Sequence, residues 1–206
     1  LVLAAQYESF IIPLAIVFSL PVGVFGSFML LKLMGLENNI YAQIGLIMLA
    51  GVVALYWQSA KITGTPTYLL SDLANIDFGT SVGRWMFVAF FIAFAIKAPM
   101  FPVHTWLPDT TEQATPGTAV MLVSVLDKIG TFGMIRFCLE LFPEASRWAT
   151  PVVVVLAIIS ILYGALMAIG SKDIMRLIAY TSVSHFGFIV MGIFVMNSQG
   201  LSGANL

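Results

Sequence analysis

The chain has very few of the side chains that metal and redox sites require. Cys138 is its only cysteine, and His104 and His185 are its only histidines, among 206 residues. One thiol cannot form an internal disulfide, and it cannot ligate an iron–sulfur cluster, which needs about four cysteines. The sequence shows no zinc or haem spacing and no glycine-rich phosphate loop. We therefore predict no catalytic redox residue, no metal site and no cofactor-binding site in this chain.

Charged residues are also scarce. They make up 9% of the chain, and hydrophobic residues make up 60%, whereas about 25% of a soluble domain is charged. This composition predicts an all-α protein that crosses a membrane several times. The formal net charge of −1 gives no electrostatic basis for binding nucleic acid. The sequence begins in an apolar stretch without a signal peptide, so we interpret the chain as an internal piece of a longer membrane protein.

Six segments are long and apolar enough to span a bilayer core of about 30 Å, which takes roughly 20 helical residues. We predict one transmembrane domain over 1–206, with helices at 10–31, 40–59, 84–107, 116–141, 151–170 and 174–196. A short interfacial helix is expected within 65–74. The linker 171–173 is so short that the last two helices must be antiparallel neighbours. Basic residues are divided equally between alternate loops, so the positive-inside rule gives no orientation.

The third span should be broken, because Pro99 and Pro102 follow Lys97. Each proline lacks an N–H group and clashes with the preceding helical turn. Transporters often place broken helices at their ion sites, because unwound backbone offers unpaired carbonyl and amide groups. Lys97 therefore lies where an ion site is expected.

Three predicted spans carry a titratable side chain at depth. A rise of 1.5 Å per residue puts Lys128 and His185 near mid-membrane and Lys97 beyond the midpoint. A lysine at the bilayer centre costs roughly 2.5–3.5 kcal/mol on insertion scales, so these positions favour a proton path. Three structural alternatives stay open: Lys97 snorkels to an interface, Lys128 joins an ion pair, and His185 is a core histidine. Asp127 is the nearest acid to Lys128 in sequence, but adjacent helical residues point about 100° apart.

A buried lysine beside a movable carboxylate can act as a proton switch. The reference pKa of lysine is about 10.4; burial lowers the pKa of a lysine, and a carboxylate within about 4–6 Å raises it. One pKa unit is worth about 1.36 kcal/mol, and moving one charge against 100 mV takes about 2.3 kcal/mol. A change of two or three units in the lysine pKa is thus of the right size to move one proton, provided that an outside energy source moves the carboxylate.

The remaining polar residues are given simpler interpretations. Thr181 and Ser182 precede His185 by four and three residues, so they share a polar stripe with it. Arg136 and Glu140 have the i, i+4 spacing of a helix-end ion pair. The charges expected to be solvated in loops are Asp109, Glu112, Glu144 and Arg147.

Several motifs together resemble the antiporter-like proton-pumping subunits of respiratory complex I. They are FFIAFAIKAPMFPVHTWLPD, LVSVLDKIGTFGMIRF, FPEAS and YGALMAIGSKDIMRLIAYTSVSHFGF. The chain is most similar to the subunit M type, the bacterial counterpart of mitochondrial NADH dehydrogenase chain 4. The match covers about 85–194, and the upstream YESFIIPL resembles the family's glutamate-bearing helix.

The resemblance implies an inverted-repeat fold of about fourteen helices, of which this chain holds the fifth to the tenth. It implies that Glu8 is the carboxylate partner of Lys97, that Lys128 connects two half-channels, that His185 belongs to the central polar axis, and that His104 lines the first half. These five are the predicted proton-transfer residues. By the same resemblance, the loops that hold Glu37, Asp109 and Lys172 would face the cytoplasm.

The function implied is proton translocation by a non-redox subunit of an NADH:quinone oxidoreductase, a translocase driven by electron transfer in partner subunits. Those partners would carry the FMN, iron–sulfur clusters and quinone. The neighbours would be the other complex I membrane subunits, above all two sibling antiporter-like subunits, together with membrane lipid. The implied location is the bacterial inner membrane rather than the mitochondrial one. The alternatives are a subunit of a multi-subunit cation/proton antiporter or membrane-bound hydrogenase, and a purely structural membrane subunit.

Two positions depart from the family pattern. Thr111 stands where many relatives have histidine, and Asp127 stands where many have an apolar residue before the connecting lysine. We hypothesise that water and either Glu112 or Asp127 fill the gap in the relay. The possible auxiliary residues are therefore Asp127, Glu112, Thr181 and Ser182.

Overall fold

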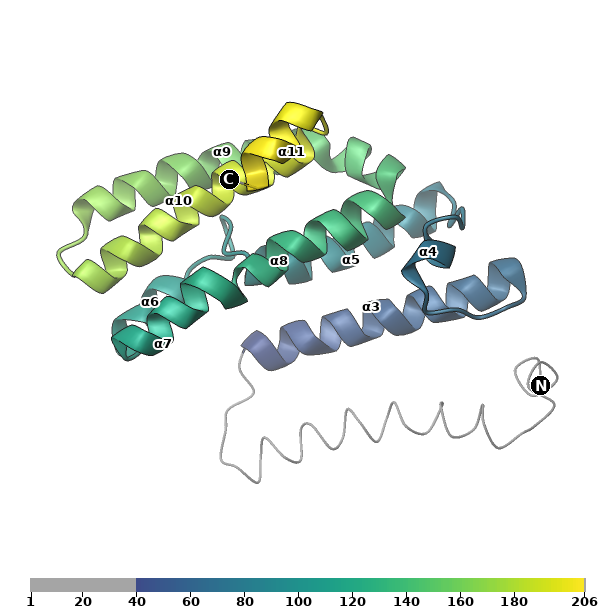
Figure 1. Ribbon diagram of the computed structural model, residues 1–206, viewed down its shortest axis with the longest axis horizontal. Coiled ribbons are helices and arrows are strands. Elements are labelled where there is room, and N and C mark those ends of the chain that lie inside the picture. The colour runs from purple at the N-terminus through teal and green to yellow at the C-terminus, as the bar shows by residue number, and fades with distance from the viewer. Residues whose placement is uncertain (1–39, 206) are drawn as a thin grey trace, which may run out of the picture. The chain divides into compact units, whose positions relative to one another are not determined.

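The structure, a computed structural model, describes residues 40–205 (Figure 1). Glu8, Glu37 and the predicted helix at 10–31 lie outside the described residues. The chain divides into two compact units, Leu1–Tyr68 and Leu69–Leu206, and each is described by itself. Every regular element in the described range is a helix, which confirms the predicted all-α class. That 1–206 forms one transmembrane domain stays a prediction.

The described part of the first unit is helix α3 (Ile40–Thr63), which runs beyond the predicted end at 59. Side chains hold its last turn together. The Ser59 hydroxyl donates to the Tyr56 carbonyl at 2.8 Å and accepts from the Thr67 N–H at 3.2 Å. The Tyr56 ring stacks on Tyr68, with centroids 4.3 Å apart. These contacts fold the segment after α3 back onto its end.

The second unit contains the broken span and the helices packed around it. Its elements are α4 (Leu70–Leu73), α5 (Thr80–Lys97), α6 (Trp106–Gln113), α7 (Pro116–Met121), the π-helix η1 (Leu122–Leu126), α8 (Lys128–Gly133), the π-helix η2 (Met134–Leu139), α9 (Pro143–Gly170), α10 (Ile174–Phe194) and α11 (Ser198–Asn205). Four stretches among the described residues are long and apolar enough to cross a membrane: Thr80–Lys97, Pro116–Leu139, Pro143–Gly170 and Ile174–Phe194.

Helix α9 begins earlier than its predicted start at 151. Pro143 occupies its first turn, and Pro151 lies inside the helix. Both prolines suit a first turn, where the missing N–H group costs nothing. An interior proline leaves one backbone carbonyl without its helical donor, and membrane proteins tolerate this where neighbouring groups compensate. The helix starts at the first of the two prolines, eight residues before the predicted start.

Helices α9 and α10 form the antiparallel pair that the short linker requires, and they lie side by side in Figure 1. Small residues allow the two backbones to approach closely: a Cβ atom on Gly164 would lie 2.7 Å from the Ser184 backbone nitrogen. The Ser184 hydroxyl donates across the interface to the Ile161 carbonyl at 3.1 Å. Small residues and interhelical hydrogen bonds of this kind are typical of helix packing in membranes.

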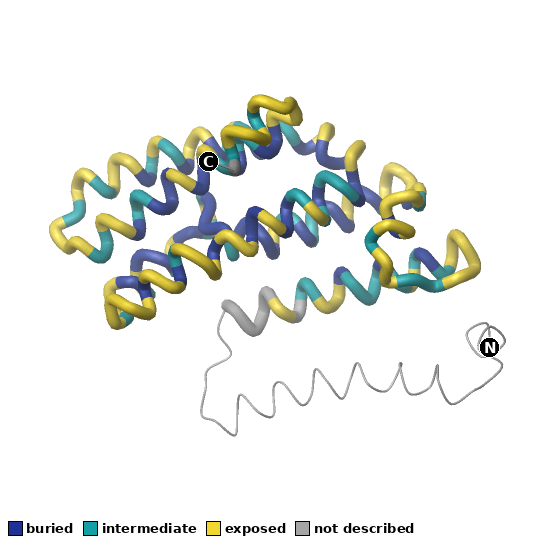
Figure 2. The backbone as a smooth tube through the Cα atoms, in the orientation of Figure 1, coloured by how far each residue is buried: buried dark blue, intermediate teal, exposed yellow. Residues whose placement is uncertain are grey.

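The core of the second unit lies where its helices face one another, and many outward faces remain apolar. Phe87, Phe90 and Phe94 on α5 are buried, and the Phe90 ring stacks on Phe137 with centroids 5.6 Å apart. Figure 2 shows that buried residues turn inward and that long stretches of α9 are exposed. Exposed residues of α9 include Val152 and Leu166. Such a surface suits lipid, which is as apolar as these side chains.

Candidate functional site

The third span is broken directly after Lys97, as the prolines predict. Helix α5 ends at Lys97, and Ala98 has extended backbone angles, with φ −89° and ψ 91°. The Trp106 indole N–H donates to the Ile96 carbonyl at 2.8 Å. The Lys97 Nζ atom lies 5.8 Å from the centroid of the Trp106 ring. Trp106 thus satisfies a carbonyl of the last turn of α5 and faces the lysine, a role that was not predicted although the residue stands in PVHTWLPD.

The break is also fixed to the helix pair behind it. The Phe101 backbone N–H donates to the Ser160 hydroxyl of α9 at 3.3 Å. The same hydroxyl donates to the Val183 carbonyl of α10, also at 3.3 Å. Since Ser160 is fully buried, one side chain ties the non-helical segment 98–105 to two helices. The non-helical segment is therefore held in place by hydrogen bonds to the neighbouring helices.

Lys97 forms an ion pair with Asp127. The Lys97 Nζ atom lies 3.8 Å from Asp127 Oδ1, and the two side chains are 19% and 0% exposed. The ammonium group therefore has an acidic partner inside the helical spans, which does not fit simple snorkelling to an interface. Asp127, the neighbour of Lys128 in the sequence, therefore faces Lys97 instead. The expected pairing of Lys97 with Glu8 lies outside the described residues.

The local backbone explains why Asp127 and Lys128 face different ways. The Asp127 N–H donates to the Leu122 carbonyl at 3.1 Å, which is an i→i+5 bond and marks the π-helical turn of η1. Asp127 is fully buried, whereas Lys128 is exposed within the unit. Single π-turns inside longer helices are frequent at functional sites. The π-helical turn therefore sets the direction of the Asp127 side chain, which points towards Lys97 at the end of α5.

Gly130 allows α8 to pack directly against the break. A Cβ atom at this position would lie 2.6 Å from the Ala98 nitrogen and 2.9 Å from the Phe94 carbonyl oxygen. Gly130 follows Asp127 by three residues, so both lie on the same face of the helix. The close approach at Gly130 therefore holds the carboxylate near Lys97.

Lys128 and His185 line one cleft of about 660 Å³ between α8, η2, α10 and α11. Thr131 contributes a third polar side chain, and the other lining residues are apolar or small: Phe132, Ile135, Phe188, Ile189, Ile193, Gly203 and Ala204. Two titratable residues from different spans thus share one space. That Lys128 connects two half-channels and that His185 belongs to the central polar axis stay predictions.

His104 lies apart from that cleft, under the break. It is 2% exposed, and its ring meets Tyr163 of α9 edge-on, with centroids 4.8 Å apart. Within the described part of the chain, its Nδ1 atom has no hydrogen-bond partner. Tyr163 in turn approaches Tyr180 of α10 at 6.4 Å between centroids. His104 is therefore held by ring contacts, with one buried ring nitrogen that no described residue contacts by a hydrogen bond.

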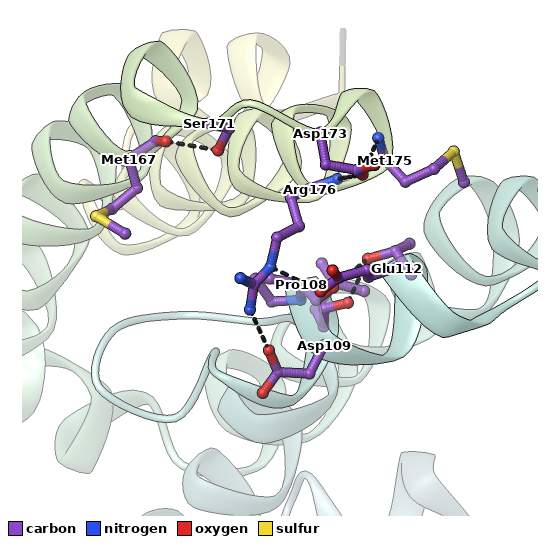
Figure 3. A network of polar contacts seen from close by, with 10 residues as sticks. Pro108, Asp109, Glu112, Met167, Ser171, Asp173, Met175 and Arg176 are labelled. Carbon is purple, nitrogen blue, oxygen red and sulfur yellow. Dashed lines mark hydrogen bonds and ion pairs between the residues drawn. The ribbon is translucent and has the colours of Figure 1, made fainter.

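Glu112 and Asp109 pair with Arg176 rather than with either intramembrane lysine (Figure 3). The Arg176 Nε atom lies 3.1 Å from Glu112 Oε2, and its terminal nitrogen lies 2.5 Å from Asp109 Oδ1. Asp173 caps α10 by accepting from the Arg176 backbone N–H at 3.0 Å. Asp109 and Glu112 are exposed, as expected, but they belong to α6 rather than to a loop, and they face the first turn of α10.

The hydroxyl groups considered as auxiliaries donate within their own helices. Thr181 donates to the Leu177 carbonyl at 2.8 Å, and Ser182 donates to the Ile178 carbonyl at 3.0 Å. Thr111, which is buried, donates to the Leu107 carbonyl of α6. None of these three residues lines the Lys128 cleft.

The other predicted charges lie near their expected positions. Arg136 and Glu140 form the predicted i, i+4 ion pair at 2.6 Å, which confirms that prediction. Glu144 and Arg147 are exposed, as expected, but they belong to the first turns of α9 rather than to a loop.

Known proteins with this sequence pattern are membrane subunits. Residues 18–206 match the family described as NADH:quinone oxidoreductase/Mrp antiporter, transmembrane. NADH-quinone oxidoreductase subunit M of Mycobacterium tuberculosis (strain H37Rv) is 52% identical over 172 residues, which cover 79% of this chain and 30% of the relative. Subunit M of Escherichia coli (strain K12) is 42% identical over 166 residues, which cover 80% and 33%. NADH-ubiquinone oxidoreductase chain 4 of Chondrus crispus is 37% identical over 201 residues, which cover 97% and 39%.

Solved structures agree with these sequence matches. A chain of respiratory complex I from Thermus thermophilus with bound NADH superposes with a TM-score of 0.69 at 36% identity, over 78% of this chain and 35% of that chain. A chain of the Mrp complex from Dietzia sp. DQ12-45-1b superposes with a TM-score of 0.70 at 26% identity, over 89% and 32%. The chain thus spans about a third of the length of these relatives. The fold, the family match and the relatives confirm the resemblance: this chain belongs to the NADH:quinone oxidoreductase/Mrp antiporter transmembrane family.

Proposed function

We propose that the chain is part of a proton-translocating subunit of an NADH:quinone oxidoreductase in a bacterial inner membrane. The subunit would carry no electrons itself. Partner subunits would hold the FMN, iron–sulfur clusters and quinone, and the two sibling antiporter-like subunits would lie beside it in the membrane with lipid around them. The names of the bacterial relatives support this assignment.

One observation carries the proposal: Lys128 and His185, from two different apolar spans, line the same cleft. A lysine inside a bilayer is expensive and marks an ion or proton pathway by default. A cleft of about 660 Å³ has room for several waters, since one water takes about 30 Å³ in the liquid. Water between an ammonium group and an imidazole provides a route for a proton.

Lys97 supplies a second carrier at the helix break, and His104 supplies a buried nitrogen on the other side of the same segment. A carboxylate near an ammonium group favours the protonated form, and its withdrawal favours release. Movement of an acidic neighbour would therefore make Lys97 take up and release a proton. Glu8 stays the expected family partner in this step, and Lys128 would pass the proton towards the His185 side of the cleft.

The test replaces Lys128 by alanine in the full-length subunit and assembles the complex in its own membrane. Proton pumping per NADH oxidised is measured in inverted membrane vesicles, and assembly is followed on native gels. Lys172→Ala is the matched control, since this lysine lies in the exposed turn between α9 and α10. We expect Lys128→Ala to assemble and to pump fewer protons per NADH, and Lys172→Ala to pump normally. Equal pumping in the two variants would favour a purely structural subunit.

A cation/proton antiporter subunit is the second candidate, because the Mrp chain superposes over 89% of this chain. The 52% and 42% identities to subunit M relatives favour the first. Vesicles without NADH separate the two: an antiporter would exchange protons when sodium ions are added, and a complex I subunit would not.

A further inference from the structure

The proposed function gives no role to the buried carboxylate of Asp127. Its side chain is 0% exposed, and neither oxygen accepts a hydrogen bond from any residue in the described range. Buried charges are normally paired and hydrogen-bonded, because removing an ion from water is costly. The cation that the structure places beside it, Lys97 Nζ, lies 3.8 Å away, which is beyond hydrogen-bond length. An acid held in this way is well suited to gain and lose a proton.

The position of Asp127 in the chain connects the two proposed sites. Its carboxylate meets Lys97 at the break, and the next residue, Lys128, lines the cleft with His185. The π-helical turn before it makes this possible, because the Asp127 N–H bonds to Leu122 rather than to Val123, which an α-helix would use. Asp127 therefore contacts the break through its side chain and is joined to the cleft through the next residue of the chain.

We propose that Asp127 is a proton carrier that links Lys97 to the Lys128 cleft; this rests on the function proposed above. In the first step, an N–H bond of the Lys97 ammonium breaks and an O–H bond forms on Asp127 Oδ1, so both groups become neutral. In the second step, that O–H bond breaks and an N–H bond forms on the neutral Lys128 amine. Asp127 is then a carboxylate again, and one proton has moved from the break to the cleft.

The proposal requires a titratable side chain at position 127, whereas a structural role requires only the shape. Asp127→Asn keeps the shape and removes the proton-binding group, and Asp127→Glu keeps the group. The matched control is Glu140→Gln, which removes one acid from the same span at its helix-end pair with Arg136. All variants are made in the full-length subunit of the assembled complex, reconstituted in liposomes, and protons pumped per NADH are measured.

We expect Asp127→Asn to assemble and to lower the proton-to-NADH ratio as far as Lys97→Ala does. The double variant should be no worse than either single one, because the two residues serve one step. Asp127→Glu should recover part of the ratio, and Glu140→Gln should match the wild type. Normal pumping by Asp127→Asn would overturn the proposal. If Lys97→Ala lowers the ratio and Asp127→Asn does not, only this inference fails; if neither lowers it, the proposed function fails too.

Should Asp127→Asn not assemble, infrared difference spectra of the NADH-reduced complex against the oxidised complex decide the question. The wild type should show a protonated-carboxyl C=O band that changes frequency in Asp127→Glu. Identical spectra for the two proteins would overturn the proposal.

Discussion

Gly130→Ala tests the geometry of the Lys97 site without touching either charged residue. The new Cβ atom would lie 2.6 Å from the Ala98 nitrogen. Ordinary contacts begin at 3.4 Å, so α8 and the break must separate by about 0.8 Å, the difference between the two distances. Overpacking of this kind typically costs about 1–3 kcal/mol.

The same separation weakens the ion pair. At 3.8 Å and an effective dielectric constant of about 20, two unit charges attract by about 4 kcal/mol. If the pair lengthens by about 0.8 Å, the attraction falls by about a sixth, or roughly 0.8 kcal/mol. We therefore expect Gly130→Ala to lower both the stability of the subunit and its proton pumping.

The assay compares Gly130→Ala with Gly117→Ala, which lies in the same span and has no atom within 4 Å of the place that its new methyl group would take. The midpoint of thermal dissociation of the purified complex reports stability, and protons pumped per NADH report function. Gly117→Ala should change neither. Adding Ala98→Gly to Gly130→Ala should restore part of both, because it removes the 2.9 Å contact with the Ala98 Cβ atom but leaves the contacts with the Ala98 nitrogen and the Phe94 carbonyl oxygen. A Gly130→Ala complex as stable and active as Gly117→Ala would refute the reasoning.

Three further predictions concern the same unit. Ser160→Ala removes the hydroxyl that accepts from Phe101 and donates to α10. It should lower the stability of the subunit by about 1–3 kcal/mol, measured as a lower midpoint of thermal dissociation. An unchanged midpoint would mean that this link is not needed. Gly164→Ala should lower stability by about 1–3 kcal/mol, because its new Cβ atom would lie 2.7 Å from the Ser184 nitrogen. Gly170→Ala, with open space around it, should leave the dissociation midpoint unchanged. Equal midpoints for the two variants would contradict this. Arg176→Met should lower the dissociation midpoint only slightly, because exposed ion pairs contribute little, and the difference from the wild type should shrink in high salt. A large, salt-independent loss would contradict this.

Local chemistry explains which features could be predicted. The break after Lys97 follows from the prolines, which remove N–H donors wherever they stand. The α9–α10 hairpin follows from the length of its linker, and the Arg136–Glu140 pair follows from helical spacing. Each depends on residues that are close in sequence, so no knowledge of packing was needed.

Features that depend on rotation between distant elements were missed. The pairing of Asp127 with Lys97 depends on a π-turn, which adds a residue to one turn and changes the direction of every side chain after it; the sequence carries no reliable mark of that turn. The Arg176 pairs depend on how the short helix α6 meets α10. The cleft that Lys128 and His185 share was not predicted, since its walls come from four elements, α8, η2, α10 and α11.

The most direct test of the central claim is a structure of the assembled full-length complex at a resolution that shows ordered water. Basic side chains held away from bulk solvent must be joined by groups that conduct protons. We predict waters in the cleft between Lys128 and His185, and a hydrogen-bonded connection from them past Asp127 to Lys97. A dry cleft filled by lipid chains, with Lys128 turned to the headgroups, would contradict the account.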